Sequence, residues 1–530
     1  MPTPLPPWPG SPARYLAGAL LCLVLAAGLI FSCTDLDTPF SEDESPLVRQ
    51  GRQLASRHCS TCHAPVSPTS LDRETWVNSV LPAMAPYLGI QVLWDDQYYK
   101  PGAGSQQSSG SSTSSADSDS TVTLAEWRAI VAYFRSQAPD TLRLPSPPET
   151  LRRDLPLFTR RTPPPRENRA PATAMVRIDS LRHHIYTSDV TASRLHRWDD
   201  DLRRSSFGAP SIQGVELRFV RDSVGDRHAV VTDIGTMRAV DDRTGAVWTL
   251  NLNTGASRTL ADRLPRPVCA RPGDYNRDGR RDWIVCGFGH DTGGLYHFEQ
   301  QPDGSFEKRV LRDVPGAVDA EVGDFNDDGW LDVMVLFGHA DEGVWLFLND
   351  PNGGFEQKNL LRFPPHYGSS SLQVADFNDD GRPDLLYTSG DNADYSNILK
   401  KFHGAYIYLN QGDFQYEERF FYHFNGATEA VARDFDGDGD LDVGMIGFFA
   451  DIRDPSAQDF VYLEHTQKMT FVPHAPPIGD LGRWISMDAG DYDGDGDPDL
   501  VLGNFARRYS GGGGDPRSMR PFLVLENTRR

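Results

Sequence analysis

The sequence predicts a protein with two structured parts, a small all-α domain over residues 43–140 and an all-β domain of repeated units over residues 173–530. Apolar residues at helical spacing in 124–137 predict the first part. Five copies of an acidic loop followed by an apolar strand predict the second. Between the two parts, the proline-rich residues 141–172 are expected to form a semi-rigid linker.

The composition fits a chain rich in β-structure and turns. Its 530 residues give room for two to four domains, and 48 glycines and 39 prolines suit many tight turns. The formal net charge of −22, without any basic stripe, argues against nucleic-acid binding.

The N-terminus predicts export. Arg14 precedes the apolar run 15–31, which is short for a membrane-spanning helix of about 20 residues and fits a signal peptide over residues 1–32. Cys33 is the candidate lipidation site, at the start of a tether over residues 33–42. An uncleaved N-terminal anchor remains the alternative. Either form predicts an exported, membrane-attached protein, periplasmic or at the cell surface of a bacterium.

Two helices are expected in the first domain, at 45–57 and 124–137. The Ser- and Gly-rich stretch 102–121 between them has too few apolar residues to bury a core, so we expect a disordered insertion.

Residues 59–63, Cys59-Ser-Thr-Cys62-His63, form the motif that attaches c-type haem, and we call them the CxxCH segment. Cysteines three residues apart face the same way on a helical turn and can add to the two vinyl groups of one porphyrin. His63 then becomes the proximal iron ligand. A zinc knuckle or a redox CxxC remains an alternative, although zinc would need further ligands and only His58 lies nearby.

Met84 is the candidate sixth ligand. It is the only methionine between residues 34 and 174 and follows His63 by 21 residues, in a proline-containing segment expected to form a loop across the haem. His/Met ligation is characteristic of electron-transfer cytochromes. An ordinary core methionine is the alternative.

Together, the helix before the motif, the CxxCH segment, the methionine and the aromatic-rich closing helix resemble a class I monohaem cytochrome c. The resemblance covers about 100 residues. It implies one covalently bound haem c, electron transfer and one or more redox partner proteins.

The β-domain repeats share the pattern D-x-[DN]-x-D-G-x-x-D, followed by an apolar strand. Oxygens at positions 1, 3, 5 and 9 and the carbonyl at position 7 can converge on one calcium ion, and glycine at position 6 permits the turn. No glutamate stands at position 12 and a strand follows, so the loops are not EF-hands. The candidate calcium ligands are Asp274, Asn276, Asp278 and Asp282 in loop 1; Asp324, Asn326, Asp328 and Asp332 in loop 2; Asp376, Asn378, Asp380 and Asp384 in loop 3; Asp434, Asp436, Asp438 and Asp442 in loop 4; and Asp491, Asp493, Asp495 and Asp499 in loop 5.

These loops resemble the calcium-binding FG-GAP (VCBS-type) repeats of integrin-α-like β-propellers, which implies about five Ca²⁺ ions. Without cations the carboxylates would repel one another, so calcium is expected to contribute to folding. Acidic turns without metal are the alternative.

The repeat spacing of 50 to 58 residues matches one four-stranded propeller blade each. Residues 175–199 and 228–251 look like two degenerate blades, which predicts seven in all. Residues 521–527 match the third strand of a blade, so the last blade lacks its outer strand. We expect residues 155–160 to supply that strand and close the ring.

Cys269 and Cys286 flank loop 1 on adjacent predicted strands and are expected to form a disulfide, with two buried free thiols as the alternative. His290, His339 and His366 are expected to be ordinary loop residues, and Trp484 a core residue.

Two functions fit the sequence. In the first, the propeller is a scaffold that docks a redox partner, or a protein or glycan ligand, for an electron-carrying cytochrome without catalytic residues. In the second, the propeller is a dehydrogenase-like enzyme that feeds electrons to the haem. The absence of a recognisable catalytic motif favours the first.

Overall fold

The computed structural model describes residues 44–93, 97–100, 122–164, 170–205, 210–221, 227–391, 398–450, 457–506 and 519–529. The predicted signal peptide, Cys33, the tether and the serine-rich insertion lie outside these ranges. Within them, no helix is both long enough and apolar enough to cross a membrane.

The N-terminal part is helical, and both predicted long helices are present. Its elements are α1 Pro46–His58, η1 Cys59–Thr61, η2 Pro68–Ser70, α2 Arg73–Thr75, η3 Trp76–Val80, α3 Leu81–Met84, η4 Ala85–Leu88, β1 Gln91–Val92, β2 Tyr98–Tyr99 and α4 Leu124–Gln137. The bounds of α4 match the expected 124–137.

Local signals set the ends of the two long helices. The Ser45 side chain caps α1 by accepting from Val48 N at 3.4 Å, and Thr123 with Glu126 forms a capping box at the start of α4. The helices cross at Gly51, where an added Cβ would lie 2.0 Å from the carbonyl oxygen of Ala129. Only glycine therefore allows so close a crossing.

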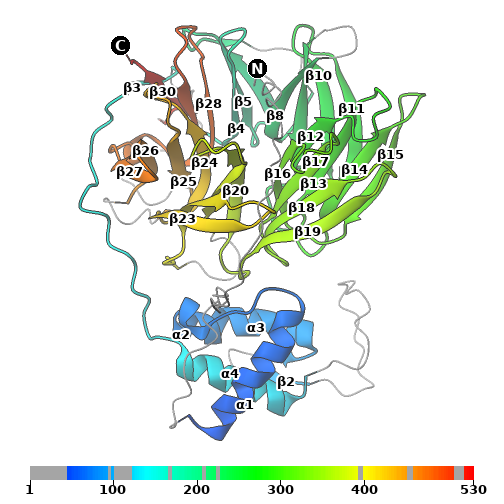
Figure 1. Ribbon diagram of the computed structural model, residues 1–530, viewed down its shortest axis with the longest axis vertical. Helices are drawn as coiled ribbons and strands as arrows, with labels where there is room; N and C mark the ends of the chain where they lie inside the picture. Colours follow the sequence, from blue (N-terminus) through cyan, green and yellow to red (C-terminus); the bar gives the residue numbers. More distant parts are fainter. Residues whose placement is uncertain are drawn as a thin grey trace, which may run out of the picture.

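The all-β part forms seven four-stranded antiparallel sheets, arranged as the blades of a propeller (Figure 1). The first two blades are β4 Thr173–Asp179, β5 His184–Asp189, β6 Arg194–Trp198 and β7 Arg204–Ser205; and β8 Gly214–Arg221, β9 Arg227–Asp233, β10 Gly245–Asn251 and β11 Ser257–Leu264. These are the two degenerate blades that the sequence predicts.

The next four blades carry loops 1 to 4. They are β12 Pro267–Gly273, β13 Asp282–Gly287, β14 Gly294–Gln300 and β15 Phe306–Arg312; β16 Ala317–Gly323, β17 Asp332–Phe337, β18 Gly343–Asn349 and β19 Phe355–Arg362; β20 Ser369–Ala375, β21 Asp384–Ser389, β22 Gly404–Asn410 and β23 Tyr416–His423; and β24 Ala427–Arg433, β25 Asp442–Gly447, β26 Phe460–Gln467 and β27 Thr470–His474.

The strand after each acidic loop is the second in its blade and is buried along its whole length (β13, β17, β21 and β25). It lies between the first and third strands and is covered on both faces by neighbouring blades. This explains why these segments read as continuous apolar runs and not as alternating ones.

The seventh blade is closed by a strand from the N-terminal side of the domain. It comprises β28 Trp484–Gly490, β29 Asp499–Asn504, β30 Phe522–Asn527 and β3 Phe158–Arg161, with a short 3₁₀ helix, η5 Gly479–Leu481, before it. β3 pairs antiparallel with β30, from Phe158 opposite Asn527 to Arg161 opposite Val524. The predicted ring closure is confirmed. Trp484 is 1% exposed, as expected for a core residue.

The segment before β3 is bound more closely than a linker would be. Arg152 N donates to Pro473 O at 2.9 Å, and Ala475 N donates to Arg152 O at the same distance. The imidazole of His474 lies between Asp154 and Glu464, at 2.6 and 3.0 Å. Part of the predicted linker therefore belongs to the propeller, because the sixth blade offers backbone partners along β27.

The helical part and the acidic loops lie on opposite faces of the propeller. Each acidic loop joins the first strand of its blade to the second. The helices instead contact connections between the second and third strands of a blade, and a connection from the fourth strand of one blade to the first strand of the next. Tyr87 Oη donates to Asp291 Oδ1 at 3.3 Å, Trp76 contacts His366, and Ile398 packs against the helical core. Figure 1 shows the helices below the blades, with the chain after α4 running up to β3.

Candidate functional site

The CxxCH segment begins where α1 ends. Cys59 opens the 3₁₀ turn η1, and Cys62 follows it directly. A 3₁₀ helix has about three residues per turn, so residues i and i+3 lie above one another. Both thiols are free, with Cys59 half-buried and Cys62 exposed. The local geometry thus presents two cysteines on one side of the turn.

The His63 ring is held in one orientation. Its Nδ1 lies 2.8 Å from the carbonyl oxygen of Ala64, so Nδ1 carries the proton and Nε2 is the nitrogen with a free lone pair. Burial lowers the pKa of His63 from its usual value, which favours the neutral form. A neutral imidazole with one nitrogen fixed by a backbone carbonyl is the form that binds metals.

The Cys59 thiol does not resemble a redox thiol. Burial, followed by the charge of Cys62, raises the pKa of Cys59 to about 11, whereas redox CxxC motifs have lowered pKa values. Among the described residues, acidic, His or Cys side chains converge in groups of three only in loops 4 and 5.

Met84 ends α3 and packs against the same hydrophobic core as Cys59. The expectation of a loop here is wrong, because residues 73–88 form consecutive helical turns that include a π-helical turn at Trp76–Val80. Pro82 lies in α3 directly after this π-helical turn, within the continuous run of helical turns. The structure therefore places Met84 and the CxxCH segment in one helical unit.

His366, expected to be an ordinary loop residue, lies between β19 and β20 and contacts the helical unit. Both of its ring nitrogens are buried without a hydrogen-bond partner among the described residues. Its ring lies 6.5 Å from that of Trp76 in the helical unit and 4.9 Å from that of Phe402. Nothing local distinguishes it from His339, whose Nε2 lies 3.1 Å from His290 O.

Glu342, directly before β18, is buried on the propeller face that meets the helices. One carboxylate oxygen accepts from Ser369 N at 2.7 Å and from Ser369 Oγ, and the other has no partner among the described residues. Burial raises the pKa of Glu342 to about 8 from a usual value of 4.5. The folded chain thus holds a proton that the unfolded chain releases in this range.

We therefore expect Glu342 to make stability fall as the pH rises from about 4.5 to about 8. Glu342→Gln should match the parent in melting temperature at pH 5 and exceed it at pH 9, because the amide cannot ionise. Glu356→Gln, at an exposed glutamate in β19, is the control and should follow the parent. Parallel pH profiles for the parent and Glu342→Gln would contradict this expectation.

The five acidic loops share one backbone fold. In loop 1, the two oxygens of Asp274 accept from Asp278 N at 3.0 Å and Gly279 N at 2.9 Å. Loops 2 and 3 repeat these bonds. Glycine at position 6 has a positive φ in every loop, as expected, and position 4 does too. In loops 4 and 5 position 4 is also glycine, which adopts this conformation without strain.

The last aspartate of each motif fastens the loop to its blade. Asp499 is fully buried and accepts from Tyr492 N at 3.0 Å and from Asn527 N at 2.8 Å. The equivalents, Asp282, Asp332, Asp384 and Asp442, are also fully buried. The aspartate at position 9 therefore connects the loop to the second and third strands of its blade through hydrogen bonds. The sequence pattern does not reveal this role.

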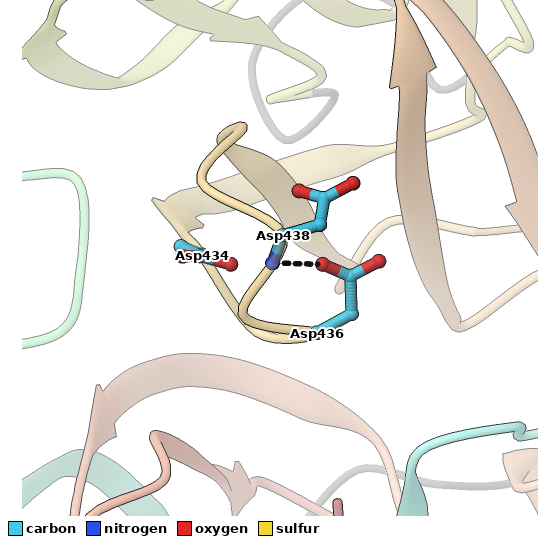
Figure 2. Close-up of side chains that lie close together, drawn as sticks. All are labelled: Asp434, Asp436 and Asp438. Carbon is cyan, nitrogen blue, oxygen red and sulfur yellow. Dashed lines mark hydrogen bonds between the residues drawn. The ribbon is translucent and has the colours of Figure 1, made fainter.

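Loops 4 and 5 bring three carboxylates together. Oxygens of Asp434, Asp436 and Asp438 lie within 4.8 Å of one another, as do those of Asp491, Asp493 and Asp499. Figure 2 shows loop 4, where Asp438 N donates to Asp436 at 3.1 Å and the carboxylates crowd around one turn. Burial and the neighbouring carboxylates raise the pKa of Asp436.

Loops 1 and 3 have less excess negative charge. Arg280 forms an ion pair with Asp278, and Arg382 forms one with Asp380. Loops 4 and 5 carry Asp440 and Asp497 at the same position, and Asp497 forms an ion pair with Arg529 at 2.9 Å.

Cys269 and Cys286 lie directly opposite one another on β12 and β13, with Cα atoms 5.1 Å apart, and the structure joins them in a disulfide.

The FG-GAP-like repeat family matches residues 274–335 and 324–387, which cover loops 1 to 3. A search of curated proteins found no match. Among solved structures, the chain is similar to one in the BBS1N–ARL6DN complex (10% identity, TM-score 0.44, 70% of this chain and 97% of that one). A chain in the S. cerevisiae complex of dbp5, nup159 and gle1 has 11% identity, a TM-score of 0.40 and coverage of 70% and 93%. The gluconolactonase XC5397 from Xanthomonas campestris has 14% identity, a TM-score of 0.34 and coverage of 53% and 84%. The assignment of a seven-bladed propeller with FG-GAP-like repeats is therefore based on the family match and on the order of the strands.

Proposed function

We propose that this protein is an exported, membrane-anchored c-type cytochrome that transfers electrons, and that its propeller is a calcium-binding docking scaffold. The observation that carries this proposal is the CxxCH segment at the end of α1, with two free thiols on one turn and an oriented His63. Cys59 and Cys62 would hold haem covalently, and His63 and Met84 would bind its iron. The haem would supply one-electron chemistry.

The donor set favours haem over the alternatives. The raised pKa of Cys59 disfavours a redox dithiol, and in the described residues Cys59, Cys62 and His63 do not bring three ligand atoms within 4.8 Å of one another. Met84 shares a hydrophobic core with Cys59, and Trp76, Trp127 and Phe134 add aromatic surface to that core. Such surroundings suit a large apolar porphyrin.

The acidic loops suit calcium. Ca²⁺ binds carboxylate oxygens at about 2.3–2.6 Å, so oxygens within 4.8 Å of one another can share one ion. We expect loops 4 and 5 to bind most tightly, since no arginine replaces their seventh-position aspartate. Loops 1 to 3 each retain an asparagine oxygen and three carboxylates.

A covalent haem assay tests the cytochrome proposal. The full chain, matured in a host that attaches c-type haem, should retain haem absorbance after denaturation and acid–acetone extraction. Cys59→Ala with Cys62→Ala should abolish that absorbance. Cys269→Ala with Cys286→Ala, which removes the other cysteine pair, should leave it unchanged. A parent protein without covalent haem would overturn the proposal.

The same preparation distinguishes between an electron carrier and an enzyme. The oxidised holoprotein would be mixed with candidate organic substrates while the α-band is recorded. We expect no reduction until a redox partner is added. Substrate-dependent haem reduction by the purified chain would instead favour a catalytic propeller.

A further inference from the structure

Charged groups of the propeller act on the CxxCH segment. The charges of Arg362 and Asp341 both act on the pKa of His63. These two residues form an ion pair with Nε–Oδ1 at 2.8 Å, and Arg312 binds the same carboxylate at 2.6 Å. His63 therefore lies within electrostatic reach of an ion-paired part of the propeller.

His366 lies on this surface and lacks a polar partner. Its ring is held edge-on by Trp76 from the helical unit and by Phe402 and Tyr367 from the propeller. Aromatic contacts of this kind fix the orientation of the ring. Both ring nitrogens are nevertheless buried without a hydrogen bond among the described residues. A buried polar group without a partner is costly, so its neighbour in the functional protein is expected to be a polar group.

The surroundings of His366 are cationic. Burial first, and then the electrostatic effects of Lys400, His63 and Lys401, lower the pKa of His366 to about 3. Lys400 is itself only 3% exposed. Positive charges around an imidazole N–H favour an anionic acceptor, because a charge-assisted hydrogen bond is stronger than a neutral one.

We propose that His366 is a further haem-binding residue, donating a hydrogen bond across the domain interface to a propionate carboxylate of the haem held by the CxxCH segment. The inference rests on the proposed function. The two carboxylates are the anionic groups that such a haem brings, and Met84 already offers the helical unit its own sixth iron ligand. Haem attachment then joins the helical unit to the propeller, and the docking scaffold forms one wall of the haem site.

The test compares His366→Leu in two forms of the full chain, the haem-loaded protein and the haem-free Cys59→Ala/Cys62→Ala protein. In the haem-loaded form, His366→Leu should lower the melting temperature by about 2 °C or more, since it removes a hydrogen bond to a charged group. In the haem-free form it should not lower the melting temperature, because there the imidazole has no partner to lose. His366→Gln retains an N–H donor and should recover part of the loss.

His339→Leu is the matched control. It lies on the same face, but its hydrogen bond to His290 O does not involve haem, so its effect should be the same in both forms. The midpoint potential gives a second readout. His366→Leu should lower it, because a less compensated carboxylate favours the oxidised iron, while the spectrum of the axial ligands stays unchanged.

Three outcomes would overturn the inference. An equal change in both forms would make His366 a structural residue only. Loss of an axial-ligand signature in His366→Leu would make it an iron ligand. Absence of covalent haem from the parent would remove the proposed function as well, which separates that failure from the first two.

Discussion

Removal of calcium is expected to lower the melting temperature of the propeller by at least about 10 °C. Each site occupied at 100 times its Kd adds about 2.7 kcal/mol to the stability of the folded state, and five loops act on one cooperative ring. The physical cause is carboxylate crowding, which is most severe in loops 4 and 5, where three carboxylate oxygens lie within 4.8 Å. Thermal unfolding with calcium and with a chelator measures the effect.

A loop variant makes this prediction specific. Asp434→Asn with Asp436→Asn removes two carboxylates from loop 4 and should reduce the calcium-dependent gain in melting temperature. Asp350→Asn changes an aspartate in the β18–β19 turn, which lies on the same face outside the motifs, and should leave the gain intact. Identical melting temperatures with and without calcium would show that the loops are acidic turns without metal.

Deletion of residues 150–165 is expected to lower the melting temperature of the propeller sharply. Without β3, the seventh blade keeps three strands, and β30 becomes an open edge with unpaired backbone groups. The deletion also removes Phe158, whose ring packs at 5.6 Å from the rings of both Phe435 and Tyr462. The loss spreads around the ring, because each blade packs on the next.

A point variant tests the contribution of β3 to ring closure without deleting any residues. Phe158→Ala should cost about 3–5 kcal/mol, as for other buried Phe-to-Ala changes. Thr159→Ala, at an exposed position of the same strand, should cost little. Urea unfolding measures both. Equal, small effects of the two variants would mean that β3 does not close the ring.

Much of the architecture could be predicted from short segments of sequence. Helix α4 begins at the Thr123 capping box, and its apolar stripe runs to Phe134 in the last turn, so its bounds follow from about 15 residues. The conformation of the acidic loops also depends on nearby residues, since the hydrogen bonds that Asp274 accepts from Asp278 and Gly279 reach no further than five residues along the chain. Ring closure could also be predicted, because residues 521–527 match the third strand of a blade and the last blade therefore lacked its fourth strand.

Other features depended on packing that no short segment encodes. The segment around Met84 was expected to be a loop, yet consecutive helical turns form there because Trp76 and Leu81 are buried in the helical core. Residues near Arg152 were expected to be linker, yet β27 offers them backbone partners. Both errors arise because burial and free hydrogen-bonding groups on distant elements outweigh local preference.

The sequence by itself determined the motifs: the CxxCH segment, the five acidic loops, the blade repeat and the disulfide candidates. Each depends on residues close together in the chain or on a regular period. Only the tertiary structure decided that the acidic loops and the helical unit occupy opposite faces, and that His366 lies beside Trp76 and near His63. The docking of two separately encoded parts sets that placement, because Trp76 and His366 are far apart in the chain and meet only where the helical unit contacts the propeller.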